Sequence, residues 1–212
     1  MLTIYTSRMG LVIGITGGVA SGKTVVLEMF RELGAETISA DKIAHELLST
    51  DSGVISEISE NWPEVIDVDG SVSRKRLGEI VFSDESERRK LNDIMHPRII
   101  SALEERIRCY RNNENSAEVL AAEIPLLIEC NLTGLVDKVL VVVSEQEEQI
   151  SRLRIRGLET EEAVKRIMSQ MPLEDKKAFA DWVIQNSGSI DDTRIQVEKV
   201  WQEAVRLSRN NK

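Results

Sequence analysis

Unbroken apolar stretches and helical periodicities alternate along this chain of 212 residues. The apolar run Leu11–Thr16 ends in two glycines, which is typical of a strand buried on both faces. Apolar positions then recur at helical spacing over Lys23–Glu32, Gly34 stands where a helix C-cap belongs, and Glu36–Ser39 reads as a short strand. Strand, helix and strand in this order form a βαβ unit, which implies a parallel sheet.

From Asp41 to about Arg111 the pattern changes to several helical stretches broken by turns. The polar segment Asn112–Ser116 then returns the chain to strand patterns at Glu118–Ala122, Lys138–Val143 and Trp182–Ile184. Ser144–Glu147 reads as a capping box that starts a helix after the second of these strands. The fold class that this order predicts is α/β, a doubly wound parallel sheet with a helical insertion between its second and third strands.

Composition limits the classes of partner. Lys and Arg number 27 against 36 for Asp and Glu, a net charge of −9, which argues against nucleic-acid binding. The longest apolar run, Val139–Val143, is far short of the ~20 residues that span a membrane. The N-terminus lacks a signal-peptide pattern, and Cys109 and Cys130 have no pairing pattern. We therefore expect a cytoplasmic protein with no nucleic-acid, membrane or obligate protein partner.

One segment carries a specific motif for phosphate binding. The sequence GGVASGKT matches G-x-x-x-x-G-K-[ST] between a strand and a helix start. Its residues are Gly17, Gly18, Val19, Ala20, Ser21, Gly22, Lys23 and Thr24. The glycines let consecutive N–H groups point at phosphate oxygens, and the positive end of the following helix adds to that anion site. We expect Lys23 to face the β- and γ-phosphates of ATP and the Thr24 hydroxyl to hold Mg²⁺.

Two carboxylates follow strands of the predicted sheet. Asp41 comes directly after the second strand, where it would share an edge with the phosphate loop and accept a proton from an acceptor hydroxyl. The alternative is that Asp41 is only the N-cap of the next helix. Glu123 ends the third strand, where a Walker-B-type acid holds Mg²⁺ through water, although a carboxylate at a strand end is common.

Basic residues add a further kinase feature. Arg152, Arg154 and Arg156 cluster in a predicted helix and indicate a lid that closes over polyphosphate, although such a cluster is also typical of a solvated face. Helical spacing places Arg152 and Arg156 on one face and Arg154 away from it. Arg74 starts a helical stretch, where it is either part of an anion-binding patch or simply a solvated residue at the helix start. His96-Pro97 is interpreted as another helix start.

Taken in order, several segments resemble the dephospho-coenzyme A kinase family. They run from about Met9 to Gly188, and the most specific are His96-Pro97, Pro125-Leu126-Leu127-Ile128-Glu129 and Gln170-Met171-Pro172-Leu173-Glu174 with Lys176. Also in family order are Ala40-Asp41, Leu91-Asn92, Gln149 with Arg152 and Arg156, Ala180-Asp181, and Val183-Ile184 with Asn186. The resemblance implies a P-loop NTPase-type three-layer α/β/α fold in one domain over residues 9–209. It also implies a helical acceptor lobe at about 41–111, a short lid at about 150–175 and an N-terminal extension over 1–8.

The resemblance also implies a reaction, which is transfer of the ATP γ-phosphoryl group to the ribose 3′-hydroxyl of dephospho-coenzyme A with Mg²⁺, the last step of coenzyme A biosynthesis. Asp41 matches the catalytic acid–base position, Lys23 the phosphate-loop lysine, and Arg152 and Arg156 the lid arginines. The candidate substrate residues are Thr16, Asp41, Arg74, His96, Pro125, Leu126 and Glu129.

The sequence departs from the family pattern at three places. Ser39 stands where an acid is usual, His45 stands where an arginine is usual, and the segment after Arg156 is one residue shorter. Two alternative functions stay open, another P-loop kinase acting on a nucleoside monophosphate or a small alcohol, and a nucleotide-dependent switch. A guanine-reading Asn-Lys-x-Asp segment, which a GTPase switch would need, does not occur in the chain.

Overall fold

The computed structural model describes residues 10–210, so the expected extension over residues 1–8 lies outside the described part of the chain. The chain divides into two compact units. The first, here called the sheet unit, runs to Ser39 and resumes at Ile107, and the second, the helical unit, is Ala40–Arg106. Across residues 10–210, no helix is both long enough and apolar enough to cross a membrane.

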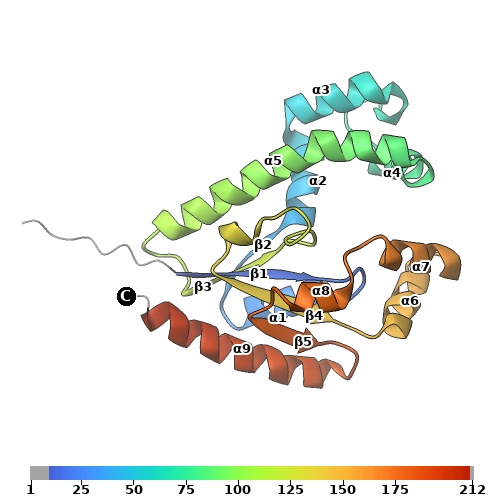
Figure 1. Ribbon diagram of the computed structural model, residues 1–212. Helices are drawn as coiled ribbons and strands as arrows, with labels where there is room; N and C mark the ends of the chain where they lie inside the picture. The colour runs from blue at the N-terminus through green and yellow to red at the C-terminus, as the bar shows by residue number, and fades with distance from the viewer. Residues whose placement is uncertain (1–9, 211–212) are drawn as a thin grey trace, which may run out of the picture. The chain divides into compact units, whose positions relative to one another are not determined.

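Five parallel strands form the sheet unit, in the order β2-β3-β1-β4-β5 (Figure 1). Their bounds are β1 Leu11–Gly17, β2 Glu36–Ser39, β3 Val119–Glu123, β4 Lys138–Val143 and β5 Trp182–Gln185. All seven residues of β1 are buried because this strand is the centre of the sheet, with a strand on each side and a layer on each face. The predicted parallel sheet is therefore confirmed, and the run of apolar residues that predicted β1 follows from its central place.

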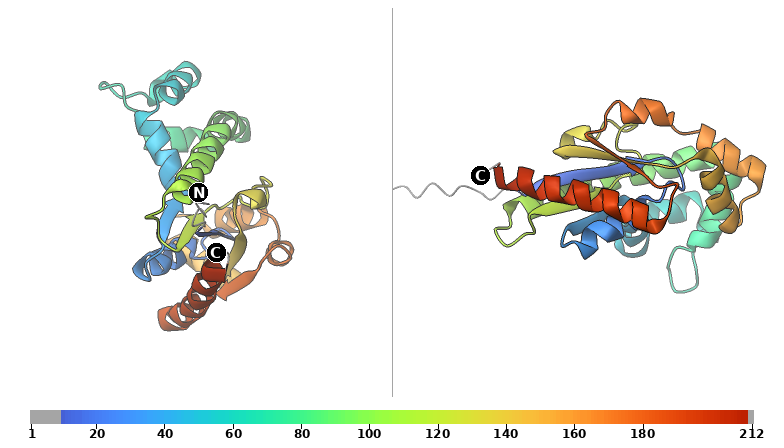
Figure 2. Two further views of the ribbon diagram at one scale, coloured as in Figure 1. Left: turned by 90° about the vertical axis from the view of Figure 1, so that its left-hand side faces the viewer. Right: turned by 90° about the horizontal axis from the view of Figure 1, so that it is seen from below.

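One face of the sheet is covered by α1 (Lys23–Glu32) and α9 (Ile190–Asn210), which contact the strands and each other (Figure 2). Ile13 and Ile15 belong to this core, in which the rings of Phe30 and Trp201 meet edge to face at 6.4 Å. Burial of these apolar side chains stabilises the unit at roughly 25 cal/mol per Å² removed from water.

The other face of the sheet is closed by the segment after β3 and by α8 (Leu173–Lys177). A Cβ atom at Gly14 would lie on this side, 2.7 Å from Leu127 Cδ2, so a larger residue there would displace the buried Leu127 side chain. The turn Thr133–Leu135 (η2) precedes β4. Layers on both faces of a parallel sheet confirm the three-layer α/β/α fold.

Between β4 and α8 the chain forms a helix pair, α6 (Gln146–Ile155) and α7 (Thr160–Met168), which pack through Leu153 and Ala163. The predicted capping box at Ser144–Glu147 is wrong. The backbone stays extended through Glu145, so α6 begins at Gln146, and the Ser144 hydroxyl is buried without a hydrogen-bond partner among the described residues. The serine stands one residue too early to accept from the first turn of α6.

The helical unit packs its own apolar cluster, formed by Val54, Ile58, Trp62, Val65, Leu77, Val81 and Met95. Its elements are α2 Ala40–Thr50, α3 Ser52–Asn61, the turn η1 Pro63–Val65, α4 Arg74–Ser83, and α5 Glu85–Asn112, whose end continues into the sheet unit. The predicted helix start at His96-Pro97 is wrong, because Pro97 lies inside α5. Asp84 caps α5 instead, and apolar contacts of the helix keep it continuous across the proline.

Candidate active site

The phosphate loop leaves β1 at Gly17 and enters α1 at Lys23, and three of its residues have positive φ. These are Gly17 at 150°, Ala20 at 54° and Gly22 at 94°. A Cβ atom at Gly22 would lie 1.9 Å from Asn186 Nδ2, so both the backbone angle and the close approach require glycine there. The motif therefore has the curled backbone that a phosphate cradle needs.

The start of α1 is suited to an anion. Gly22 is its N-cap and provides no side-chain acceptor, and the first turn holds no acidic residue. The orphan N–H groups of that turn therefore remain for a ligand. The Ser21 hydroxyl is fully buried in the loop and has no hydrogen-bond partner among the described residues. A buried orphan hydroxyl beside a helix N-terminus fits a phosphate group.

Lys23 lies along the loop with its side chain buried. Its Nζ donates to the carbonyl oxygens of Gly18 at 2.8 Å and Gly17 at 3.4 Å. These contacts hold the ammonium group inside the curve of the loop, where its charge would meet bound phosphate oxygens.

Thr24 and Glu123 lie together, as the metal hypothesis requires. The Thr24 hydroxyl donates to Glu123 Oε1 at 2.9 Å, and the Ser39 hydroxyl donates to Glu123 Oε2 at 3.2 Å. The Glu123 side chain is buried at the end of β3. One hydroxyl and one carboxylate next to a phosphate cradle are the donor set that Mg²⁺ uses with substrate phosphates, so these residues fit the ion. Serine at position 39 also spares Glu123 a second, repelling carboxylate.

Two glutamines hold Val19. Gln149 Nε2 donates to the Val19 carbonyl at 2.9 Å, and the Val19 N–H donates to Gln170 Oε1 at 2.8 Å. Both glutamines also line a cleft of about 420 Å³ that opens beside Gly18, with apolar walls that include Ile167. Side chains from α6 and from the segment after α7 therefore reach the phosphate loop directly.

Arg152 is the lid arginine that contacts the loop. Its guanidinium donates to the Ala20 carbonyl at 3.1 Å and to the Asn186 carbonyl at 2.7 Å. Asn186 in turn donates to the Ser21 carbonyl at 2.8 Å and accepts from the Thr193 hydroxyl at 2.9 Å. The arginine, the asparagine and the loop backbone thus form one hydrogen-bonded network.

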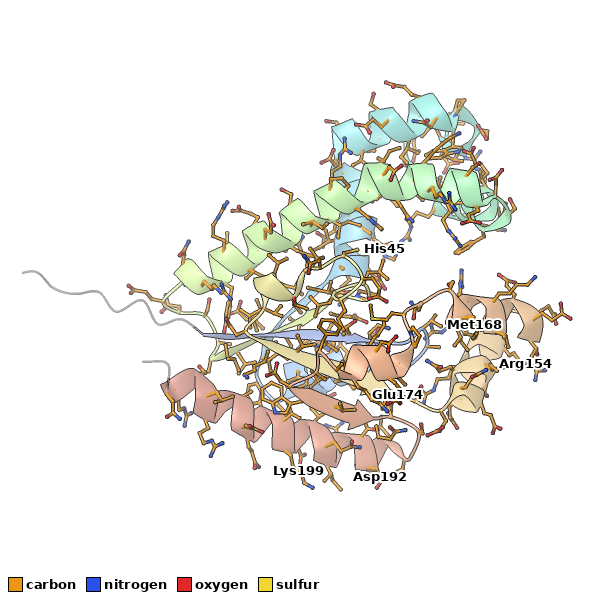
Figure 3. All side chains as sticks on the ribbon, viewed as in Figure 1. His45, Arg154, Met168, Glu174, Asp192 and Lys199 are labelled. Carbon is orange, nitrogen blue, oxygen red and sulfur yellow. The ribbon has the colours of Figure 1, made fainter. Side chains whose placement is uncertain are left out.

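The other two arginines lie differently. Arg156 is the exposed C-cap of α6, one helical turn after Arg152, so the expectation that the two share a helical face stays a prediction. Arg154 is exposed on the outer side of α6 (Figure 3). Gly157, whose φ is 91°, ends the helical path directly after Arg156.

The predicted substrate residues of the sheet unit make internal contacts. Thr16 is fully buried and its hydroxyl donates to the Pro125 carbonyl at 3.0 Å, while Leu126 is half-buried. Glu129 forms an ion pair with Lys176 at 2.7 Å. Burial, with the Glu129 carboxylate nearby, raises the pKa of the Cys130 thiol, so this cysteine is a poor nucleophile at neutral pH.

In the helical unit, Asp41 lies in the first turn of α2, so the interpretation that it is an N-cap is wrong. Its carboxylate is exposed and has no hydrogen-bond or ion-pair partner among residues 10–210. His45 (Figure 3) and Arg74 line one hollow of about 320 Å³ together with Ser71. His96 is half-buried on α5 and is not one of the residues that line this hollow.

Four side chains that hold the loop were assigned no role from the sequence, namely Gln149, Gln170, Lys176 and Asn186. Each contacts the loop across more than a hundred residues of chain, which no local pattern reveals. Their one signal in the sequence was their place in the family motifs.

Comparison with known proteins agrees with this geometry. A family model described as dephospho-CoA kinase matches residues 11–192. A dephospho-CoA kinase of Bacillus cereus (strain ATCC 10987 / NRS 248) is 44% identical over 194 residues, which cover 91% of this chain and 96% of the relative. The dephospho-CoA kinase of Carboxydothermus hydrogenoformans is 38% identical over 193 residues, which cover 90% of this chain and 93% of that relative. The solved structure of a dephospho-CoA kinase from Campylobacter jejuni aligns with a TM-score of 0.67 and 31% identity, covering 92% of this chain and 98% of that one. This chain therefore belongs to the dephospho-CoA kinase family.

Proposed function

We propose that this protein transfers the γ-phosphoryl group of ATP to the ribose 3′-hydroxyl of dephospho-CoA, giving CoA and ADP in the cytoplasm. The observation that carries the proposal is the network in which Lys23, Thr24 with Glu123, and Arg152 all meet at one phosphate loop. Family membership supplies the acceptor, since the relatives named above are dephospho-CoA kinases.

The sheet unit would bind the triphosphate. Loop N–H groups and the Ser21 hydroxyl would take the β-phosphate, and the Lys23 ammonium would neutralise charge that moves toward the β–γ bridging oxygen. Thr24 and Glu123 would hold Mg²⁺, which when bound neutralises charge on the β- and γ-phosphate oxygens. Arg152, already at the loop, and Arg156, the C-cap of α6, would add positive charge near the transferring group.

Asp41 would orient the 3′-hydroxyl and accept its proton. The hydroxyl oxygen forms the new bond to phosphorus, the bond to the β–γ bridging oxygen breaks, and ADP leaves with that electron pair. An exposed carboxylate without a competing partner is suited to this role. The residue follows Ser39, a neighbour of Glu123, by two positions in the chain.

The hollow beside α4 is suited to an anionic part of the acceptor. Arg74 is the first residue of α4, so its guanidinium and the N-terminus of that helix offer positive charge at one place, with His45 alongside. Glu46 also lines the hollow, and its carboxylate is paired with Arg106. We propose that these groups bind the diphosphate of dephospho-CoA. His96, Thr16, Pro125, Leu126 and Glu129 stay candidates for contacts to the rest of the acceptor.

Acceptor choice tests the function directly. ADP release is measured with ATP and Mg²⁺ in the presence of one acceptor at a time, which is dephospho-CoA, AMP, shikimate or water alone. The phosphorylated product is identified by mass spectrometry. We expect turnover with dephospho-CoA and with its 2′-deoxy analogue, and none with the 3′-deoxy analogue, which lacks the reacting hydroxyl. Turnover with water alone would favour a nucleotide switch, and faster turnover with AMP or shikimate would favour another kinase. Lys23→Ala is the blank, because a folded variant without the loop ammonium should be inactive.

A further inference from the structure

Lys176 is a fully buried lysine in a part of the chain that the mechanism above does not use. It belongs to α8, which lies alongside β4 (Figure 1), and its exposed fraction is 0%. A buried ammonium group is costly unless it is paired and hydrogen-bonded. The partners that Lys176 has therefore indicate its role.

Two partners hold the Lys176 ammonium. Its Nζ forms an ion pair with Glu129 Oε1 at 2.7 Å and donates to the carbonyl oxygen of Gly17 at 3.4 Å. Lys23 Nζ donates to that same carbonyl oxygen, also at 3.4 Å. Two lysines from opposite ends of the sequence thus converge on the first residue of the phosphate loop.

The arrangement places one negative charge close to the site where phosphate must bind. The Glu129 side chain is 21% exposed, and a chain of three contacts, through the Lys176 ammonium and the Gly17 carbonyl, links its carboxylate to Lys23. Without Lys176, the carboxylate would be drawn toward the Lys23 ammonium and would compete there with the triphosphate.

We propose that Lys176 is a positioning residue for ATP binding. It neutralises Glu129 and holds the Gly17 carbonyl, so that the charge of Lys23 acts on the bound phosphates. The segment that carries Lys176 also reaches the loop through Gln170, which accepts from the Val19 N–H, so α8 and the residues before it fix the loop at two points. This inference rests on the proposed binding of ATP at the loop.

A charge cycle on purified full-length protein tests the proposal by ATP affinity, measured by calorimetry without acceptor. Lys176→Met should weaken ATP binding by about tenfold or more, the scale of one lost charge-assisted contact. Lys176→Met combined with Glu129→Gln should recover most of that loss, because the competing carboxylate is gone. Glu129→Gln alone should bind ATP at least as tightly as wild type. Lys199→Met is the control, since Lys199 is an exposed lysine of α9 that does not line the cleft beside Gly18 (Figure 3).

Each outcome has a defined meaning. A Lys176→Met protein with wild-type unfolding midpoint and wild-type ATP affinity would overturn the proposal, as would a double variant no better than the single one. If Lys176→Met does not fold, Glu129→Gln still decides, because weaker ATP binding by that variant with a wild-type unfolding midpoint contradicts the competition on which the proposal depends. Failure of the wild-type protein to bind ATP would instead refute the proposed function.

Discussion

Asp41 shows how much a single side chain depends on its backbone position. It lies in the first turn of α2 rather than at the N-cap, so its negative charge interacts favourably with the helix dipole, but its side chain accepts no capping hydrogen bond within the described residues. Its exposed carboxylate is therefore available for chemistry at little structural cost.

We predict that Asp41→Asn lowers kcat by ~10²–10⁴, the usual contribution of a general base, because the amide keeps the size of the side chain but accepts no proton. ATP affinity and the unfolding midpoint should stay close to wild type. Steady-state kinetics with dephospho-CoA and a thermal melt measure both.

Asp51→Asn is the matched control for this variant. Asp51 caps α3 through the Val54 N–H at 2.9 Å, and asparagine caps about as well as aspartate. The control should keep full activity. Turnover of Asp41→Asn within about threefold of wild type, far less than a lost base costs, would show that the base lies elsewhere.

At the scale of elements, helix ends were harder to predict than strands. The strands of the sheet are apolar runs, and their burial depends on a pattern within each segment. A helix cap depends on one residue standing at the exact position before the first turn. Ser144 and His96-Pro97 are residue types that often start helices, but Ser144 stands one residue too early and Pro97 lies inside α5. The phosphate loop was predictable because the positive φ angles of its backbone favour glycine, which the sequence shows directly. The contacts of Gln149, Lys176 and Asn186 depend instead on tertiary packing.

The Asp84 cap of α5 gives a prediction about pH. Hydrogen bonds from the Ser86 hydroxyl, then the Ser86 and Glu87 N–H groups, lower the pKa of Asp84 from its usual value, with help from the charge of Lys90. A carboxylate with a lowered folded pKa stabilises the fold above its ordinary pKa, and this stabilisation disappears as the pH falls through the folded value.

We therefore expect Asp84→Ala to lower the unfolding midpoint by roughly 2–4 °C at pH 7, the range for the loss of a typical cap in a chain of this size. The deficit should shrink as the pH is lowered toward 3. Melts followed by circular dichroism at both pH values measure it, with Asp84→Asn as the control that keeps a cap without a titrating group. A deficit that is the same at both pH values would contradict the assigned role.

At the scale of the whole molecule, the two compact units divide the reacting groups between them. The loop residues, Glu123 and Arg152 belong to the sheet unit, and Asp41 and Arg74 belong to the helical unit. A substitution in one unit should therefore change the handling of one substrate more than the other.

We predict that Arg74→Ala raises the KM for dephospho-CoA by ~10-fold or more and leaves the KM for ATP within about twofold, since it removes one charged contact to the acceptor. Lys75→Ala is the control, because Lys75 is the next residue on α4 but does not line the hollow with His45. Equal changes in both KM values would mean that Arg74 does not act on the acceptor. Initial rates with each substrate varied in turn make the comparison.

The central place of β1 also has a consequence for how the protein is made. The strand is synthesised before its neighbours β3 and β4, which follow about a hundred residues later. At ~5–20 residues per second, this apolar segment waits on the order of 5–20 seconds for a partner strand. We therefore expect chains that stop before β3 to leave this strand unpaired and to aggregate or be degraded, whereas chains that include β3 and β4 can complete the sheet.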